Sequence, residues 1–301
     1  MRRPVIVGVD ASHESLAAAL WAAREASHRR VPLRLLHACA WHPPLASGAL
    51  GSASRRLLAR RVLGGTEAHV RAVCPGVHLV AEQTEGPASR ALLGAAEKAD
   101  VLVLGSRGLS ALTGFVLGSV GQAVVARSAR PVVLVRAGRG AGDRRRYDTR
   151  HAGPHHAADR DVVLGLDLND PCDEVIDFAF DTARLRNARL RVVSAWSAPS
   201  ALTLGPGEVG LIDGPLRTEE WRGFQSAVLL AWRDKYPTVA VSGDVVEGRA
   251  SSALVRAAAE AALLVVGRRT REEPHMGTRT GPVTHAVSHH ARCPVAVVPH
   301  S

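Results

Sequence analysis

The sequence predicts an α/β protein built from two tandem domains, each with a doubly wound, five-stranded parallel sheet. Three observations support this prediction. A chain of 301 residues is long enough for about two domains. It repeats its own motifs in order, and each repeat alternates short apolar runs with helical stretches. Hydrophobic residues make up 46% and charged residues 22%, as in an ordinary globular protein. With only 4% aromatic residues, the expected core is Ala, Val and Leu.

The second half of the chain repeats the first. Five segments return in the same order: VIVGVDAS at 5–12 as VVLGLDLN at 162–169, LRLLHACAW at 33–41 as LRVVSAW at 190–196, EGPAS at 85–89 as EGRAS at 247–251, AAEKADVLVLG ending at Gly105 as AAAEAALLVVG ending at Gly267, and ARPVVLV at 129–135 as RCPVAVV at 292–298. Preserved order along the whole chain indicates a tandem duplication. We therefore predict one domain at 1–136 and a second at 161–301.

The stretch between the repeats, residues 137–160, contains Gly, Arg, Asp and His but no apolar periodicity. Such a composition predicts a flexible linker. Its histidines, His151, His155 and His156, are metal-ligand residue types. Because a solvated linker rarely holds a preformed site, no metal ion is expected there.

The first repeat opens with an apolar run at 5–9 that lacks alternation, as expected for a strand buried on both faces. Ser12 is a typical N-cap for the helix predicted at 13–29. A strand is expected at 33–38, and the Pro-, Gly- and Ser-rich stretch 41–52 predicts a loop.

The remaining elements of this repeat alternate in the same way. We predict a helix at 54–73, a strand at 77–82, a helix from Pro87 to Lys98, a strand at 101–104, a helix at 119–127 and a strand at 131–135. Right-handed crossovers between parallel strands then place helices on both faces of an open sheet. Ligands of such sheets bind beyond the carboxyl ends of the strands. Asp10 and Gly105 fall at that edge.

A glycine-rich loop follows the strand at 101–104. It has the pattern G-x2-G-x9-G-S, formed by Gly105, Gly108, Gly118 and Ser119. Glycine lets backbone N–H groups approach an anion, and the start of the next helix favours phosphate. The Ser119 hydroxyl can donate to a phosphate oxygen or bind a metal ion. The alternative is a glycine-rich turn without a ligand, but the coincidence of strand, spacing and helix favours phosphate binding.

Two further residues, Ser106 and Arg107, lie in this loop and belong to the predicted binding site. Arg107 either adds positive charge or points to solvent. The loop is not a Walker A motif, because no Gly-Lys-Ser or Gly-Lys-Thr follows.

The second repeat departs from this pattern. It keeps Asp167 at the position of Asp10, but Thr270 replaces the second glycine and Pro282 replaces the serine. Proline has no N–H to donate. Arg268, Arg269 and Arg271 can still attract an anion, yet we expect weak or absent nucleotide binding there and a structural role for this repeat.

Two segments of the first repeat resemble the nucleotide-binding branch of the universal stress protein family. They are VIVGVDAS and VLVLGSRGLSALTGFVLGSVGQAVVARSARPVVLV. The resemblance extends over both repeats. It implies tandem domains with the Rossmann-like fold of the adenine nucleotide alpha hydrolases, and ATP, with or without Mg²⁺, as the cofactor.

The same resemblance implies a role for individual residues. Asp10 would hold the ribose or adenine side, Gly8 would let the nucleotide approach the first strand, and Ala38 would line the adenine pocket. The implied phosphate ligands are Gly105, Gly108, Gly118 and Ser119, together with the Val120 amide.

The expected function is therefore that of a cytoplasmic, ATP-binding stress-response protein in which the nucleotide acts as a signal. Asp10 and Glu14 have the residue types of an acid–base pair, but no nucleophile or histidine accompanies them in the loop. No catalytic residue is assigned, and the protein is not expected to be an enzyme. A slow Mg²⁺-dependent ATPase and an interaction module without nucleotide remain the alternatives. Protein clients are expected but not identified.

Other classes are disfavoured. The net charge of +10 comes almost wholly from Arg residues spread along the chain, without interleaved aromatic residues, which disfavours nucleic-acid binding. No apolar stretch is long enough for a membrane helix. The four cysteines, Cys39, Cys74, Cys172 and Cys293, are isolated and predict incidental thiols rather than zinc. We expect a solvated helix face for His285, His289 and His290.

Each repeat ends in a short apolar strand, at 131–135 and 294–298, that should be the last strand of its sheet. Exposed apolar edge strands are usually covered. The family resemblance implies that these strands pair across a two-fold axis. We therefore predict an intramolecular pseudo-dimer of the two domains, with further homodimerisation as a weaker expectation.

Overall fold

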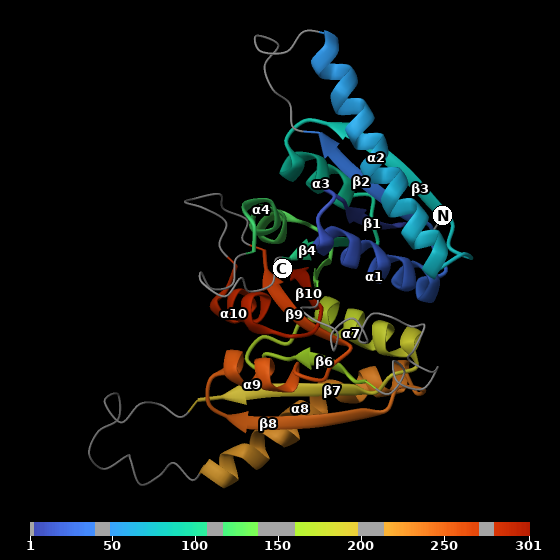
Figure 1. Ribbon diagram of the computed structural model, residues 1–301. Coiled ribbons are helices and arrows are strands. Elements are labelled where there is room, and N and C mark those ends of the chain that lie inside the picture. Colours follow the sequence, from blue (N-terminus) through green and yellow to red (C-terminus); the bar gives the residue numbers. More distant parts are fainter. Residues whose placement is uncertain (1–2, 40–48, 107–116, 138–159, 198–213, 271–279) are drawn as a thin grey trace. The chain divides into compact units, whose positions relative to one another are not determined.

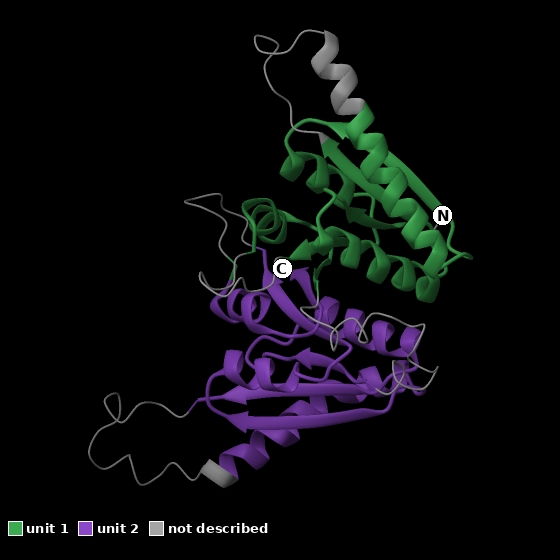
Figure 2. Ribbon diagram, viewed as in Figure 1, with its two compact units in different colours: residues 1–153, 271–280 green, residues 154–270, 281–301 purple. Residues whose placement is uncertain are grey.

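The computed structural model describes residues 3–39, 49–106, 117–137, 160–197, 214–270 and 280–301. The chain divides into two compact units (Figure 2), which we call unit one and unit two. Unit one comprises residues 1–153 with 271–280, and unit two comprises residues 154–270 with 281–301. The expected linker, 137–160, lies outside the described residues except at its two ends.

Unit one alternates strands and helices as the sequence predicts (Figure 1). Its elements are β1 (Val5–Gly8), α1 (His13–Arg29), β2 (Leu33–Cys39), α2 (Ala49–Val73), β3 (Leu79–Glu85), α3 (Ala88–Ala96), β4 (Val101–Ser106), α4 (Ser119–Arg127) and β5 (Val132–Arg136). The helix predicted at 119–127 has these bounds in the structure.

Unit two has the same order of elements. They are β6 (Val162–Gly165), α7 (Asp173–Arg186), β7 (Leu190–Trp196), α8 (Gly214–Lys235), β8 (Val241–Glu247), α9 (Ala250–Ala257), β9 (Leu263–Arg269), α10 (Pro282–His290) and β10 (Val295–His300).

Both units have the same sheet, which confirms the predicted fold class. The strand order is β3-β2-β1-β4-β5 in unit one and β8-β7-β6-β9-β10 in unit two, and the described pairs within each unit are parallel. The register also matches, because Val5 pairs with Leu33 as Val162 pairs with Leu190. The strand order reverses beside β1 and β6, so the carboxyl edge there is where such a sheet offers a ligand site.

Helices cover both faces of each sheet. In unit one, α1 packs with α2 on one face, while α3 packs with α4 on the other; in unit two the pairs are α7 with α8 and α9 with α10. The core between them is aliphatic. The central strands β1 and β4 are almost fully buried, from Val5 to Val7 and from Val101 to Val103. Rigid central strands therefore fix the positions of the residues at their carboxyl ends.

One predicted boundary is wrong. Residues 49–52 were expected to lie in a loop, but they form the beginning of α2, which starts at Ala49. The segment Ala49-Leu50 supplies good helix formers, and the following glycine and serines cost only about 1 kcal/mol or less each in a helix. An established amphipathic helix can extend through them, because propagation is cheaper than nucleation.

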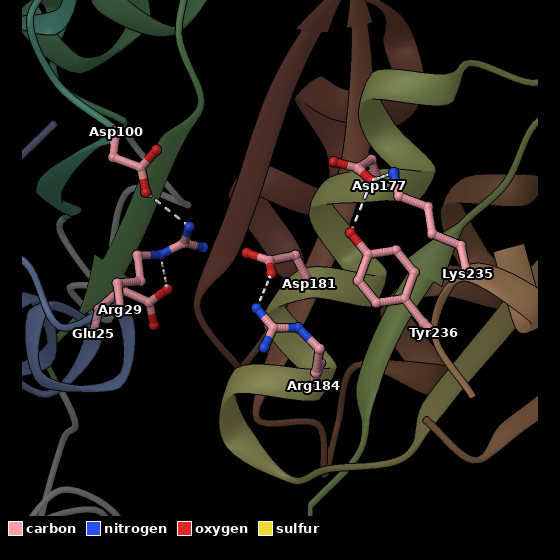
Figure 3. A network of polar contacts seen from close by, with 8 residues as sticks. All are labelled: Glu25, Arg29, Asp100, Asp177, Asp181, Arg184, Lys235 and Tyr236. Carbon is pink, nitrogen blue, oxygen red and sulfur yellow. Dashed lines mark hydrogen bonds and ion pairs between the residues drawn. The ribbon is translucent and has the colours of Figure 1, made fainter. Parts of the chain in front are cut away.

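The first helix of each unit ends in the same way but is anchored differently (Figure 3). Both end at a left-handed residue, Arg30 with φ 54° and Asn187 with φ 51°. In unit one, Arg29 donates to Glu25 at 2.6 Å and to Asp100, just before β4, at 2.8 Å.

In unit two the anchor comes from α8 instead. Asp177 of α7 accepts hydrogen bonds from Lys235 at 2.5 Å and from the Tyr236 hydroxyl at 2.9 Å (Figure 3).

The predicted pairing of the last strands of the two units stays a prediction.

Candidate functional site

A cavity of about 410 Å³ lies at the carboxyl edge of the unit-two sheet. Residues near the carboxyl ends of four strands contribute to it. Gly165 belongs to β6, Ala195 to β7, Gly267 to β9 and His300 to β10, while Asp167 lies in the turn after β6. The cavity is thus placed where a doubly wound sheet binds ligands.

These lining residues are the counterparts of residues predicted to bind a nucleotide in unit one. The matched registers of the two sheets equate Gly165 with Gly8, Ala195 with Ala38 and Gly267 with Gly105, and the same spacing equates Asp167 with Asp10.

The unit-one residues therefore share one sheet edge, although they are far apart in the sequence. Ala38 lies near the end of β2, half-buried, and Gly105 lies near the end of β4.

Asp10 shapes the turn that leads from β1 into α1. Its Oδ1 accepts a hydrogen bond from the Ser12 amide at 3.1 Å and another from the Ser12 hydroxyl at 2.5 Å. Ser12 in turn is the N-cap of α1 and accepts from the Ser15 amide at 3.1 Å, as predicted. The turn is tight, because Ala11 adopts a positive φ of 69°. The exposed carboxylate of Asp10 is thus held at the edge of the sheet.

The two glycines at the strand ends also have packing roles. A β-carbon on Gly105 would lie 2.5–2.7 Å from the backbone of Glu14 and Ser15. The first turn of α1 therefore rests directly on the end of β4. A β-carbon on Gly8 would lie 2.9 Å from Leu92 and 3.1 Å from Leu104. Close packing is a reason for glycine at both positions that sequence reasoning alone did not find.

The start of α4 is open at the same edge. Gly118 is the N-cap and makes no side-chain capping bond, and Gly118, Ser119 and Val120 are exposed. The first N–H groups of a helix lack partners within the helix. Gly118 has a φ of −56°, so a left-handed conformation is not the reason for glycine there.

The rest of the predicted loop is only partly described. Ser106 is buried, and its hydroxyl donates to the Val135 carbonyl at 3.4 Å. Arg107 and Gly108 lie outside the described residues. Their roles, like those of the other predicted binding residues, stay predictions.

In unit two the corresponding helix starts differently. Gly281 is the N-cap of α10, and Pro282 occupies its first position. Proline fits that position but removes one N–H. The proline therefore removes one N–H donor from the expected phosphate site, while α10 still begins at the position equivalent to the start of α4.

The cavity of unit two has a feature that sequence reasoning missed. Asp170, Cys172 and His300 place one side-chain ligand atom each within 4.8 Å of one another. The Cys172 Sγ lies 3.0 Å from Nδ1 of His300, and Arg269 forms an ion pair with Asp170. We call Asp170, Cys172 and His300 the thiol cluster. The only sequence signal was the pairing of an Asp-x-Cys turn with a histidine near the end of the last strand.

The cluster perturbs the acidity of its members. Burial, together with the nearby carboxylates of Asp170 and Glu174, raises the pKa of the Cys172 thiol to about 11. The hydrogen bond from Arg269 holds the pKa of Asp170 below its ordinary value. At neutral pH, without a bound ligand, the pocket therefore contains the protonated Cys172 thiol beside the charged Asp170 carboxylate.

The histidines of α10 behave differently from the expected solvated face. The rings of His285 and His289 stack with their centroids 4.3 Å apart, and His289 is buried. His285 and His290 are exposed, as expected.

Comparison with known proteins identifies the class. The universal stress protein family model matches residues 1–136 and 160–299, so the chain belongs to the universal stress protein family. It is 31% identical over 302 residues to universal stress protein Rv2623 of Mycobacterium tuberculosis, which covers 97% of this chain and 95% of that protein. Universal stress protein Rv2005c of the same organism is 31% identical over 300 residues, covering 97% and 96%.

A solved structure supports the same architecture. The crystal structure of a universal stress protein from Archaeoglobus fulgidus covers the whole chain, at 16% identity and a TM-score of 0.69. Family membership supports a role in the stress response. None of the helices in the described part of the chain combines the length and apolar character that crossing a membrane requires.

Proposed function

We propose that this protein binds ATP at the carboxyl edge of the unit-one sheet and uses the bound nucleotide as a signal in the cytoplasmic stress response. One observation supports this proposal above others. The counterparts of Gly8, Asp10, Ala38 and Gly105 line a single cavity in unit two. Unit two therefore has a ligand-sized space at the positions equivalent to those where the sequence predicts a nucleotide in unit one.

The phosphate end of the proposed site is the start of α4. Gly118, Ser119 and Val120 are exposed there, and the N-cap Gly118 has no side chain with which to cap the helix. Backbone N–H groups at a helix start and its dipole both favour a phosphate. The Ser119 hydroxyl would add a donor to a phosphate oxygen, or would hold a Mg²⁺ ion. Arg107 and Gly108 complete the loop in this proposal.

The bound nucleotide acts as a signal rather than as a substrate in this proposal. The Asp10 carboxylate is committed to the turn that starts α1, where it accepts two hydrogen bonds from Ser12. A carboxylate in that role holds the turn and a ribose hydroxyl but is poorly placed to activate water. Client proteins would then recognise the ATP-loaded state.

The test introduces a negative charge at the phosphate end. Ser119→Asp should weaken ATP binding at least about tenfold, corresponding to about 1.4 kcal/mol, because a carboxylate there repels the phosphates. The fold should be unaffected, since Asp is favourable in the first turn of a helix. Isothermal titration calorimetry of the full chain measures the affinity.

Pro282→Asp is the matched control, because it introduces the same charge at the equivalent position of α10. It should leave the ATP affinity unchanged. Equal affinity in the parent and in Ser119→Asp would contradict the proposed site. A phosphate-release assay on the same samples separates binding from turnover: steady release that Ser119→Asp abolishes would make the protein a slow ATPase.

A further inference from the structure

The thiol cluster brings together residues from opposite ends of unit two. Asp170 and Cys172 lie in the turn before α7, and His300 ends β10, separated from Cys172 by 128 positions in the chain. All three line the same cavity of about 410 Å³. The fold alone therefore assembles a sulfur, a nitrogen and an oxygen donor on one wall of an open pocket.

The turn that contains Asp170 and Cys172 is specific to unit two. The equivalent stretch of unit one is already helical, because α1 begins at His13, the counterpart of Asp170. In unit two, α7 begins only at Asp173, about one turn later. Cys172 is its N-cap but makes no side-chain capping bond. The thiol is instead directed to the Asp170 carbonyl at 3.1 Å and to His300.

The third member of the cluster is held from both sides. The amide and the hydroxyl of Thr270 both donate to the His300 carbonyl, each at 2.7 Å. The His300 ring lies against Gly267, where an added β-carbon would be only 2.9 Å from Nε2. Thr270, which replaces a glycine of the phosphate loop, thus positions a residue of the cluster. Gly267 leaves the space that the ring occupies.

We propose that Asp170, Cys172 and His300 bind a zinc ion, with its fourth coordination position open to the unit-two cavity. Thiolate, imidazole and carboxylate are the ligands that zinc takes in proteins, and three protein ligands with one open position are a common arrangement. The ligand atoms already lie within 4.8 Å of one another. The Sγ–Nδ1 distance of 3.0 Å must widen to about 3.6 Å around a tetrahedral ion.

The surrounding charges favour a cation at this point. Three carboxylates, those of Asp170, Glu174 and Asp167, act on the Cys172 thiol, and the guanidinium of Arg269 acts in the opposite sense. Arg269 pairs with Asp170 and would orient the carboxylate, so that one oxygen faces the ion while the other keeps the guanidinium. A water molecule or an anionic ligand in the cavity would fill the fourth position.

Unit one cannot form this site. The counterparts of Asp170, Cys172 and His300 are His13, Ser15 and Ala137, and Ser15 is buried with its hydroxyl donating to the Ser12 carbonyl at 3.0 Å. Zinc binding should therefore be a property of unit two alone.

The experiment uses the full chain, freed of metal with a chelator and titrated with Co²⁺ or Zn²⁺ alone. Co²⁺ bound by a thiolate gives a sulfur-to-metal charge-transfer band, which reports the ligand and not only the binding. We expect one equivalent of Co²⁺ with this band, and its loss when Zn²⁺ displaces it. No such band at saturating Co²⁺ in the parent protein would overturn the proposal.

Variants identify the ligands. Cys172→Ser should abolish the band. His300→Ala removes a ligand, so it should weaken binding by at least as much as the loss of an outer-shell partner does, which is about 10–100-fold. Cys293→Ser and His285→Ala are the controls and should leave both the band and the affinity unchanged. Circular dichroism verifies that each variant is folded. Cys172→Asp keeps an anionic donor and should retain Zn²⁺ binding without the band. An unchanged band in Cys172→Ser, or its loss in Cys293→Ser, would contradict the assignment.

Discussion

Unit one and unit two have the same sheet but differ at its carboxyl edge, where the first helix begins. In unit one, α1 starts at His13 after a tight turn, and its first turn rests on Gly105. In unit two, α7 starts at Asp173, so that first turn is missing. The His300 ring and the Val175 side chain lie against Gly267 instead.

The loss of one helical turn thus changes the chemistry of the edge. The backbone of α1 packs against Gly105 in unit one, whereas side chains pack against Gly267 in unit two. Two copies of one fold can therefore diverge in ligand without a change in strand order or register.

The largest effect is expected at the opposite end of these helices. Arg29→Ala removes an ion-pair partner of Glu25, whose side chain is 2% exposed, and also the bond to Asp100. Breaking a buried ion pair costs about 3–5 kcal/mol. Hydrogen exchange of the β1 and β4 amides should show a loss of stability of that size.

The matched variant in unit two is Arg186→Ala. Thr182 replaces Glu25 there, so this variant should lower the stability measured at the β6 and β9 amides clearly less. Equal losses in the two units would contradict this distinction.

A smaller effect is expected where α1 rests on β4. Gly105→Ala places a methyl group 2.5–2.7 Å from the backbone of Glu14 and Ser15, and backbone cannot move aside cheaply. The expected cost is about 3 kcal/mol, at the upper end for overpacking. Urea denaturation, followed by circular dichroism, measures it.

Gly267→Ala is the matched variant in unit two. There the added methyl group meets the His300 ring and the Val175 side chain, which can shift, so we expect a cost of about 1 kcal/mol. If Gly267→Ala were the more damaging of the two, the missing helical turn would not be the difference that matters.

The smallest effect concerns the tight turn itself. Ala11 adopts a φ of 69°, which costs about 1–2 kcal/mol for a residue with a side chain. Ala11→Gly removes this strain but loses about 0.5–1 kcal/mol to the greater freedom of glycine in the unfolded chain. A net stabilisation of less than about 1 kcal/mol should appear as a slightly higher urea midpoint. A lower midpoint would show that the turn is not strained.

Much of this fold could be predicted from the sequence, because the duplication shows the pattern of each element in two copies. Parallel strands such as 101–104 and the start of α4 at Ser119 were recognisable from apolar runs and glycine spacing. The family also followed from these motifs. The start of α2 at Ala49 did not, because glycine and serine in the segment indicate a loop when tertiary packing is unknown.

The site was less predictable. Gly105 was interpreted as a phosphate ligand, but its contact with the backbone of α1 depends on how a helix packs on a strand, which no local pattern contains. The thiol cluster joins Cys172 to His300 across 128 positions, so only the folded sheet brings the two together. The late start of α7 follows from Pro171 and the turn around it, where the sequence offers no clear boundary.

Native mass spectrometry of the full chain with ATP and Zn²⁺ would show whether the two carboxyl edges bind different ligands. The predicted result is one ATP and one zinc ion per chain. Ser119→Asp should then lose only the nucleotide, and Cys172→Ser only the metal. Two ATP molecules per chain, or a variant that loses both ligands together, would contradict the division of function between the units.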